Sequence, residues 1–188
     1  VLPFSTGVIG QPLPVEKITN ALPEAFRTLA ADNWFAAAHA IMTTDSIAKA
    51  RSVELSLNGQ PITLTGIAKG SGMIRPDMAT LLSYIATDAA ISPSILQKML
   101  DVSMEQSFNS ITVDGDTSTN DACILIATGK AGNSVIEDID SPDAHQFIEA
   151  LNNLSRFLAQ AIVRDGKGQP NLSVLMFNRA LIQTSVGR

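Results

Sequence analysis

The sequence is poor in the residues on which many active sites and structural cross-links depend. Among its 188 residues there is one cysteine, Cys123, so an internal disulfide framework is excluded and a reducing, cytoplasmic compartment is expected. The apolar run around Cys123 marks it as a core residue. Two histidines, His39 and His145, both in helical stretches, are the only imidazole bases. Neither has a partner at metal-ligand spacing, so no metal site is predicted.

Positive charge and long hydrophobic runs are also scarce. The chain has 13 Lys and Arg against 18 Asp and Glu, and its net charge of −5 argues against nucleic acid or an anionic membrane as a partner. A hydrophobic content of 45% with 16% charged residues is typical of a globular protein. No apolar run is long enough to span a membrane. The sequence has neither an initiator Met nor a signal-peptide pattern, and we interpret it as a piece of a longer protein.

The hydrophobic patterns that are present mix strands with helices. Residues 51–57 and 61–68 alternate apolar and polar side chains around Asn58-Gly59, which predicts a hairpin with a type I′ turn. Pro142 opens a long amphipathic helix with apolar residues at helical spacing. Further helices are expected at about 14–31, with a break or kink at Pro23, and at 34–42 and 92–107; further strands at about 80–88, 111–113 and 123–128. The fold class is therefore α+β or layered α/β.

Two polar segments look like ligand-binding loops but lack residues that such loops need at fixed positions. Residues 114–121 look like the start of a calcium loop, yet Thr119 and Leu125 stand where such a loop needs Gly and Glu. The segment is interpreted as a polar turn. The run beginning Lys69-Gly-Ser-Gly is not a P-loop, because its lysine precedes the glycines, and phosphate binding is unsupported.

Thr80 lies where the glycine-bearing loop that begins at Lys69 passes into an apolar strand. A cut between Ala79 and Thr80 would give Thr80 an α-amine able to take the proton from its own hydroxyl, so that no histidine would be needed. An ordinary threonine at a loop-to-strand junction is the alternative that these residues alone leave open. The turn Thr6-Gly7 is a candidate for the oxyanion donors, each of which is typically worth about 3 kcal/mol of transition-state stabilisation.

Six collinear segments carry a specific resemblance to a known family. They are residues 1–10, 41–45, 69–80, 84–89, 114–121 and 163–166. Together they resemble the ornithine acetyltransferases, the bifunctional glutamate N-acetyltransferases of arginine biosynthesis. The resemblance implies a layered, N-terminal-nucleophile-like fold and a ping-pong transfer of acetyl from N-acetylornithine to glutamate. It implies no cofactor, although some members also take acetyl from acetyl-CoA. It further implies that α and β chains cut from one precursor associate, as a heterotetramer in the full-length protein.

The family's three catalytic residues and its cleavage site match four positions of this sequence. Cleavage between Ala79 and Thr80 would make Thr80 the N-terminus of the β chain, the nucleophile that accepts acetyl, and a substrate contact. Thr6 and Gly7 match the oxyanion-hole pair. The resemblance thus assigns residues 1–79 to the C-terminal part of the α-chain region and 80–166 to the N-terminal part of the β-chain region, and it leaves 167–188 as an atypical tail.

Substrate contacts match at two further positions. Lys69 corresponds to a lysine facing the substrate carboxylate. Thr43, or its neighbour Thr44, corresponds to a second contact. The alternatives are an N-terminal-nucleophile aminopeptidase of similar fold and an inert, non-catalytic fragment.

The chain departs from the family's pattern at both ends. A segment ahead of Val1 and the C-terminal part of the β chain are missing. After Gly166 the family continues Glu-Gly-Ala-Thr-Lys, whereas this chain has Lys167-Gly-Gln-Pro-Asn171. A family-like coding text that loses one nucleotide after Gly166 can encode the tail from Lys167 through Gly187 and the start of an Arg codon. We therefore interpret residues 167–188 as out of frame; a divergent natural tail is the alternative. Since a substrate-facing Glu is replaced, we expect little or no activity from this exact chain.

Overall fold

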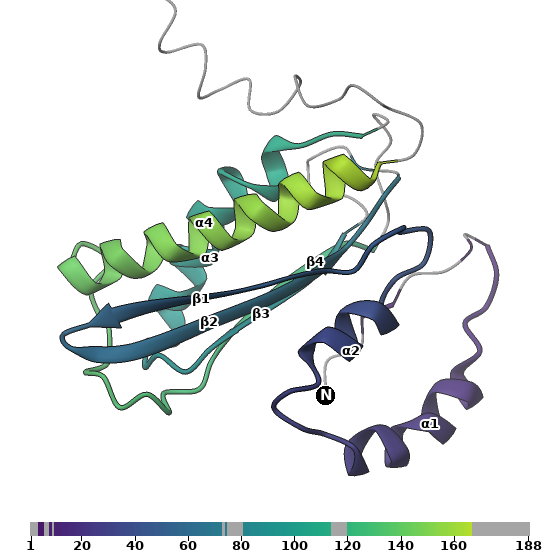
Figure 1. Cartoon of the computed structure of the whole chain (residues 1–188), viewed down its shortest axis with the longest axis horizontal. Helices are drawn as coiled ribbons and strands as arrows, with labels where there is room; N and C mark the ends of the chain where they lie inside the picture. Colours follow the sequence, from purple (N-terminus) through teal and green to yellow (C-terminus); the bar gives the residue numbers. More distant parts are fainter. Residues whose placement is uncertain are drawn as a thin grey trace, which may run out of the picture.

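A computed structural model gives the architecture of most of the chain. It describes residues 4, 5, 8, 10–72, 74, 81–113 and 120–166. In chain order the elements are α1 (Val15–Arg27), α2 (Trp34–Ala40), β1 (Lys49–Leu57), β2 (Gln60–Lys69), β3 (Leu82–Thr87), α3 (Pro93–Glu105), a 3-10 turn (Phe108–Ser110), β4 (Ala122–Ala127) and α4 (Pro142–Asp165). The mixture of strands and helices confirms the α+β class (Figure 1).

The four strands form one sheet in the order β1-β2-β3-β4. Strand β2 is antiparallel to both of its neighbours, β1 and β3, and β4 runs parallel to β3. Asn58 and Gly59 both have positive φ, at 50° and 81°, between the paired residues Leu57 and Gln60. A two-residue turn with both central φ angles positive matches the twist of the flanking strands, so the hairpin prediction is confirmed.

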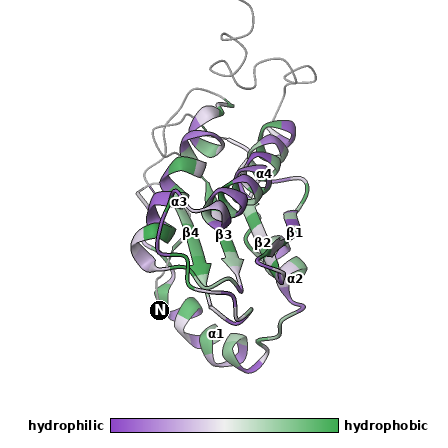
Figure 2. Ribbon diagram, turned by 90° about the vertical axis from the view of Figure 1, so that its left-hand side faces the viewer, coloured by the Kyte–Doolittle hydropathy of each residue, from purple (hydrophilic) through white to green (hydrophobic). Residues whose placement is uncertain are grey.

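Helices α3 and α4 cover one face of the sheet (Figures 1 and 2). The N-cap Ser141 accepts a hydrogen bond from the Ala144 N–H at 3.2 Å, and Pro142 occupies the first turn, as the sequence predicts. The apolar face of α4 is fully buried against β1 and β2. At Gly66 of β2 an added Cβ would lie 3.1 Å from Leu158, so the glycine permits this close approach of helix and sheet.

Both ends of α4 contact the β1–β2 hairpin, at its turn and at the first residue of β1. At the helix start, Asp143 accepts a hydrogen bond from the side-chain amide of Asn58, in the hairpin turn. At the helix end, Asp165 forms an ion pair with Lys49, the first residue of β1. Strand and helix therefore run antiparallel with contacts at each end.

Helices α1 and α2 lie on the side of the sheet away from α4 (Figure 1). Helix α2 contacts β1 and β2 and buries Ala38. Helix α1 buries none of its residues. Among the described residues, no helix is long and apolar enough to cross a bilayer.

Two local expectations differ from the structure. The break expected at Pro23 is absent, because α1 continues through this residue from Val15 to Arg27 even though a proline there removes one hydrogen bond and crowds the carbonyl four residues earlier. The kink, the other form of that expectation, stays a prediction. Residues 111–113 are not a strand: the Val113 N–H and the Thr112 hydroxyl both donate to the carbonyl of Ile74, at 2.7 and 2.8 Å. The segment is held by hydrogen bonds to the carbonyl of Ile74 and does not pair with a neighbouring strand.

Candidate active site

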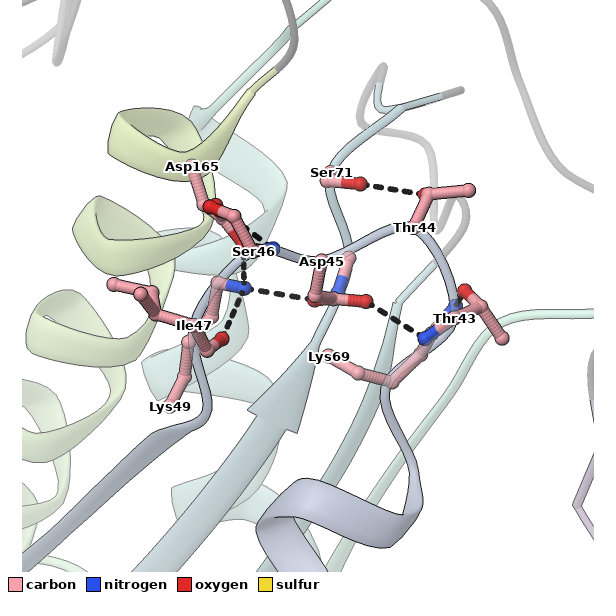
Figure 3. Close-up of polar contacts among 10 residues, drawn as sticks. Thr43, Thr44, Asp45, Ser46, Ile47, Lys49, Lys69, Ser71 and Asp165 are labelled. Atoms are coloured by element: carbon pink, nitrogen blue, oxygen red, sulfur yellow. Dashed lines mark hydrogen bonds and ion pairs between the residues drawn. The ribbon is translucent and has the colours of Figure 1, made fainter.

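Strand β2 and the loop after α2 bring together the two substrate contacts that the resemblance indicates. Lys69, the last residue of β2, donates a hydrogen bond from Nζ to Thr43 Oγ1 at 3.1 Å (Figure 3). The neighbouring hydroxyl, Thr44 Oγ1, lies 2.7 Å from Ser71 Oγ. Thr43 is thus the threonine that contacts the lysine, while Thr44 contacts the loop that follows β2.

Lys69 is a buried cation that pairs with no carboxylate of the described residues. Its exposed fraction is 3%. Burial lowers the pKa of Lys69 below its usual value; Asp45 acts in the opposite direction, Lys49 lowers it again and Asp121 raises it. A buried ammonium without a counter-ion is costly, and such groups gather at functional sites.

Asp45 connects this lysine to the loop. Its carboxylate accepts hydrogen bonds from the backbone N–H groups of Gly70, at 2.7 Å, and Thr43, at 3.2 Å. It also binds Lys49 Nζ at 2.7 Å. Burial acts to raise the pKa of Asp45, but the hydrogen bonds from Lys49, Gly70 and Thr43 hold it below its ordinary value. The ionised carboxylate therefore fixes the loop against the end of β2.

Lys49 and Asp165 complete the charge cluster. Lys49 is 2% exposed, and its Nζ lies 2.5 Å from Asp165 Oδ2. Asp165 also accepts from the N–H of Ser46, at 3.0 and 3.1 Å, and from its hydroxyl. Burial acts to raise the pKa of Asp165, and the hydrogen bonds from Lys49 and Ser46 lower it to below its usual range.

Sequence reasoning missed this cluster. Asp45 and Asp165 lie within segments 41–45 and 163–166 of the resemblance, but neither of them is assigned a role there, and Lys49 lies in no such segment. One signal was available: Asp165 stands in the last turn of a helix, where a carboxylate opposes the helix dipole unless a cation compensates it.

The predicted nucleophile Thr80, the predicted oxyanion residues Thr6 and Gly7, and Ala79 of the predicted cleavage site lie outside the described residues. Their chain neighbours are described. Leu81, which follows Thr80, donates its N–H to Asp121 Oδ1 at 2.6 Å and accepts at its carbonyl from Ala122 N–H at 3.0 Å.

Ser5, which precedes Thr6, contacts Asn120, the neighbour of Asp121 in the chain. The carbonyl of Ser5 accepts a hydrogen bond from the side-chain amide of Asn120. Asn120 and Asp121 are consecutive. They therefore join residue 5 to residue 81, the two described residues that flank the predicted oxyanion turn and the predicted nucleophile.

A separate cavity of about 530 Å³ lies between α3 and β4. Most of its lining is apolar, and it includes Cys123 together with Leu81 and Asp121. Burial raises the pKa of the Cys123 thiol to about 12, so this cysteine is a thiol and not a nucleophilic thiolate at neutral pH. Its side chain packs at the edge of the core, in agreement with its apolar surroundings in the sequence. Among the described residues no cluster of His, Cys, Asp and Glu could hold a metal ion.

Comparison with known proteins identifies the family. The model of the ArgJ family matches residues 1–181. The chain belongs to the ArgJ family. This confirms the resemblance carried by the six segments. The match continues past Gly166 to residue 181, into the tail that the sequence predicts to be out of frame, and the frame of that tail stays a prediction.

Curated ArgJ relatives are longer than this chain. The arginine biosynthesis bifunctional protein ArgJ of Psychrobacter arcticus is 55% identical over 168 residues, which are 89% of this chain and 41% of the relative. The protein of the same name from Pseudomonas syringae pv. tomato is 54% identical over 168 residues, or 42% of its length. The chain thus spans about two-fifths of the curated relatives that it matches. The crystal structure of ArgJ from Bacillus halodurans is 42% identical over 44% of this chain and 38% of that chain, with a TM-score of 0.42.

Proposed function

We propose that the complete protein containing this sequence transfers an acetyl group from N-acetylornithine to glutamate through an acetyl ester on Thr80. Family membership and the relatives' place in arginine biosynthesis support this reaction. The structural support is the link made by Asn120 and Asp121 between residue 5 and residue 81, because these two residues are the chain neighbours of the predicted oxyanion turn and of the predicted nucleophile. Acetyl-CoA would be an alternative acetyl donor, and no resident cofactor is needed.

Maturation comes first. The Thr80 hydroxyl attacks the carbonyl of Ala79, the acyl group moves from nitrogen to oxygen, and water hydrolyses the ester. The products are an α chain ending at Ala79 and a β chain beginning with Thr80. The two chains of each precursor would remain together, and the full-length protein would form a heterotetramer in the cytoplasm.

Transfer follows in two balanced steps. Thr80 Oγ attacks the acetyl carbonyl of N-acetylornithine while the α-amine of Thr80 takes the hydroxyl proton. That proton passes to the departing nitrogen, so that ornithine leaves and acetyl-Thr80 remains. The amine of glutamate then attacks the ester, giving N-acetylglutamate and restoring the Thr80 hydroxyl. Thr6 and Gly7 would stabilise each oxyanion, while Lys69 and Thr43 would hold the substrate, with the ammonium of Lys69 toward its carboxylate.

Intact-mass measurement tests both stages. We expect the gene product to separate into chains divided between Ala79 and Thr80, and we expect the β chain to gain one acetyl group on Thr80 after incubation with N-acetylornithine. A Thr80→Ala variant should show neither event. An uncut protein that transfers acetyl at full rate would refute the mechanism. Release of amino acids from peptides would instead favour an aminopeptidase.

The 188-residue chain itself should be tested in parallel. We expect it to have little or no transfer activity, because Lys167 replaces the family's glutamate and much of the β chain lies outside this sequence. An acetyl adduct on Thr80 of this chain would contradict that expectation. Sequencing codons 167–188 checks the tail: codons that give no family-like text in another frame would show that it is not frame-shifted.

A further inference from the structure

Two buried lysines share the candidate site, but their surroundings differ. The ammonium of Lys49 donates to Asp45 Oδ1 at 2.7 Å, to Asp165 Oδ2 at 2.5 Å and to the carbonyl of Ile47 at 3.2 Å. These three bonds use all the donors that an ammonium has. Among the described residues, Lys69 Nζ donates to Thr43 Oγ1 alone. Both carboxylates of the cluster are therefore bound to the same cation, and Lys69 retains donors for another acceptor.

Asp45 is the carboxylate that lies beside both lysines. Its Oδ2 accepts from the N–H of Thr43, whose hydroxyl contacts Lys69. Its Oδ1 accepts from the N–H of Gly70, the residue after Lys69. Figure 3 shows Asp45 with Lys49 on one side and Thr43 on the other. Among the other cations of the described residues, Lys69 is the one whose charge Asp45 stabilises, so it is the cation with which Asp45 could pair if Lys49 were removed.

We propose that Lys49 is a positioning residue for substrate binding: by holding Asp45 it keeps this carboxylate away from Lys69, whose ammonium then remains available for a substrate carboxylate. The inference rests on the proposed function for the identity of that ligand. N-acetylornithine and glutamate each carry an α-carboxylate that would occupy the position. A carboxylate of the protein on Lys69 would compete directly with either substrate, since one ammonium would have to exchange one anion for another.

Charge and burial agree with this division of roles. The carboxylates of Asp45 and Asp165 both bind the ammonium of Lys49, and Asp45 also binds the backbone N–H of Gly70, as expected of a structural ion cluster. Lys69 is as buried as Lys49, yet of the described titratable groups Asp45, Lys49 and Asp121 act on its charge only at longer range than an ion pair. An ammonium kept unpaired in this way binds a carboxylate more strongly than one that is already neutralised.

Two double variants of the complete gene product form a matched test, because each removes one lysine and one aspartate charge. Lys49→Met/Asp165→Asn retains Asp45, which can then pair with Lys69. Lys49→Met/Asp45→Asn retains Asp165 and leaves Lys69 without that competitor. We expect the first variant to have a KM for N-acetylornithine about tenfold higher than the second, with a much smaller difference in kcat. The single variant Lys49→Arg, which keeps the cation, should have a KM near that of the wild type.

Nuclear magnetic resonance of side-chain-labelled lysine gives a readout that does not depend on turnover. We expect Lys69 to titrate at a higher pH in the variant that retains Asp45 than in the variant that lacks it. Equal KM values and equal Lys69 titrations in the two variants would overturn the inference, as would a higher KM in the variant without Asp45. If the wild-type protein transfers no acetyl group, the proposed function fails, and the Lys69 titration alone decides whether Lys49 keeps Asp45 from Lys69.

Discussion

Lys49 and Asp165 are 116 positions apart in the chain, and their side chains meet in a buried ion pair of 2.5 Å. The pair joins the first residue of β1 to the last residue of α4. Because Lys49 also binds Asp45, one ammonium connects the sheet, the long helix and the loop that carries Thr43. The candidate substrate site is thus supported by three parts of the chain at once.

Removal of Lys49 should destabilise the fold strongly. In Lys49→Met the carboxylates of Asp45 and Asp165 lose their cation while they remain buried, and breaking a buried pair in this way costs about 3–5 kcal/mol. Urea denaturation followed by circular dichroism measures the change. The matched control is Lys98→Met, because Lys98 is exposed on α3 and makes no ion pair within the described residues. Equal effects of the two substitutions would contradict the role given to Lys49.

The substitution Lys69→Met should stabilise the fold, in contrast to Lys49→Met. The methionine removes a buried ammonium that has no carboxylate partner among the described residues, and we expect the free energy of unfolding at pH 7 to rise by about 1 kcal/mol. The pKa of Lys69 is depressed from 10.5, so the cost of its charge is present below the depressed value and disappears as the pH rises toward 10.5. Urea denaturation should therefore show a smaller difference in the free energy of unfolding between variant and wild type at pH 10.5 than at pH 7. An advantage that grows with pH would refute the argument.

Acid should weaken the ion cluster in a defined range. The pKa values of Asp45 and Asp165 both lie below their ordinary value of 3.8. Their contribution to stability is therefore complete above pH 3.8, and it is lost as the pH falls from 3.8 through the depressed values. We expect the acid limb of a stability–pH curve to be flatter in Asp165→Asn than in the wild type. Parallel acid limbs would show that Asp165 has an ordinary pKa in the folded protein.

Asp121 should matter for the position of the nucleophile. Its carboxylate holds the N–H of Leu81, the residue that follows Thr80. Asp121→Ala removes this acceptor, and a displacement of the order of 1 Å at a reacting group costs about 100-fold in rate. The time course of cleavage between Ala79 and Thr80, followed by intact mass, measures the effect. Asp121→Asn keeps an acceptor oxygen and should be cleaved faster than Asp121→Ala; the reverse order would show that the hydrogen bond to Leu81 is not what matters.

Local signals in the sequence predicted much of the fold. The Asn58-Gly59 turn fixes the hairpin because its backbone angles suit few other residues, and Pro142 with the apolar spacing after it marks α4. Each signal acts within a few residues of the structure that it produces. The same reasoning was wrong at 111–113, where a contact with the distant Ile74 replaces strand pairing.

The candidate site was predictable only in part. Lys69 and Thr43 were found through the resemblance, and the structure places them in contact. The ion cluster was not found, since it depends on a register between α4 and β1 that no local pattern encodes. The predicted roles of Thr80, Thr6 and Gly7 stay predictions, because these residues lie outside the described part of the chain.

The contacts at the two ends of α4 also have a mechanical meaning. This helix of 24 residues spans about 36 Å and is fastened at one end to the hairpin turn and at the other to Lys49. A shift of α4 along β1 by a single residue would break both contacts together. The two contacts therefore fix the position of the helix along the strand. A mutation at the hairpin tip, far from Lys69, can therefore shift the loop that carries Thr43 by pushing on the helix from its remote end.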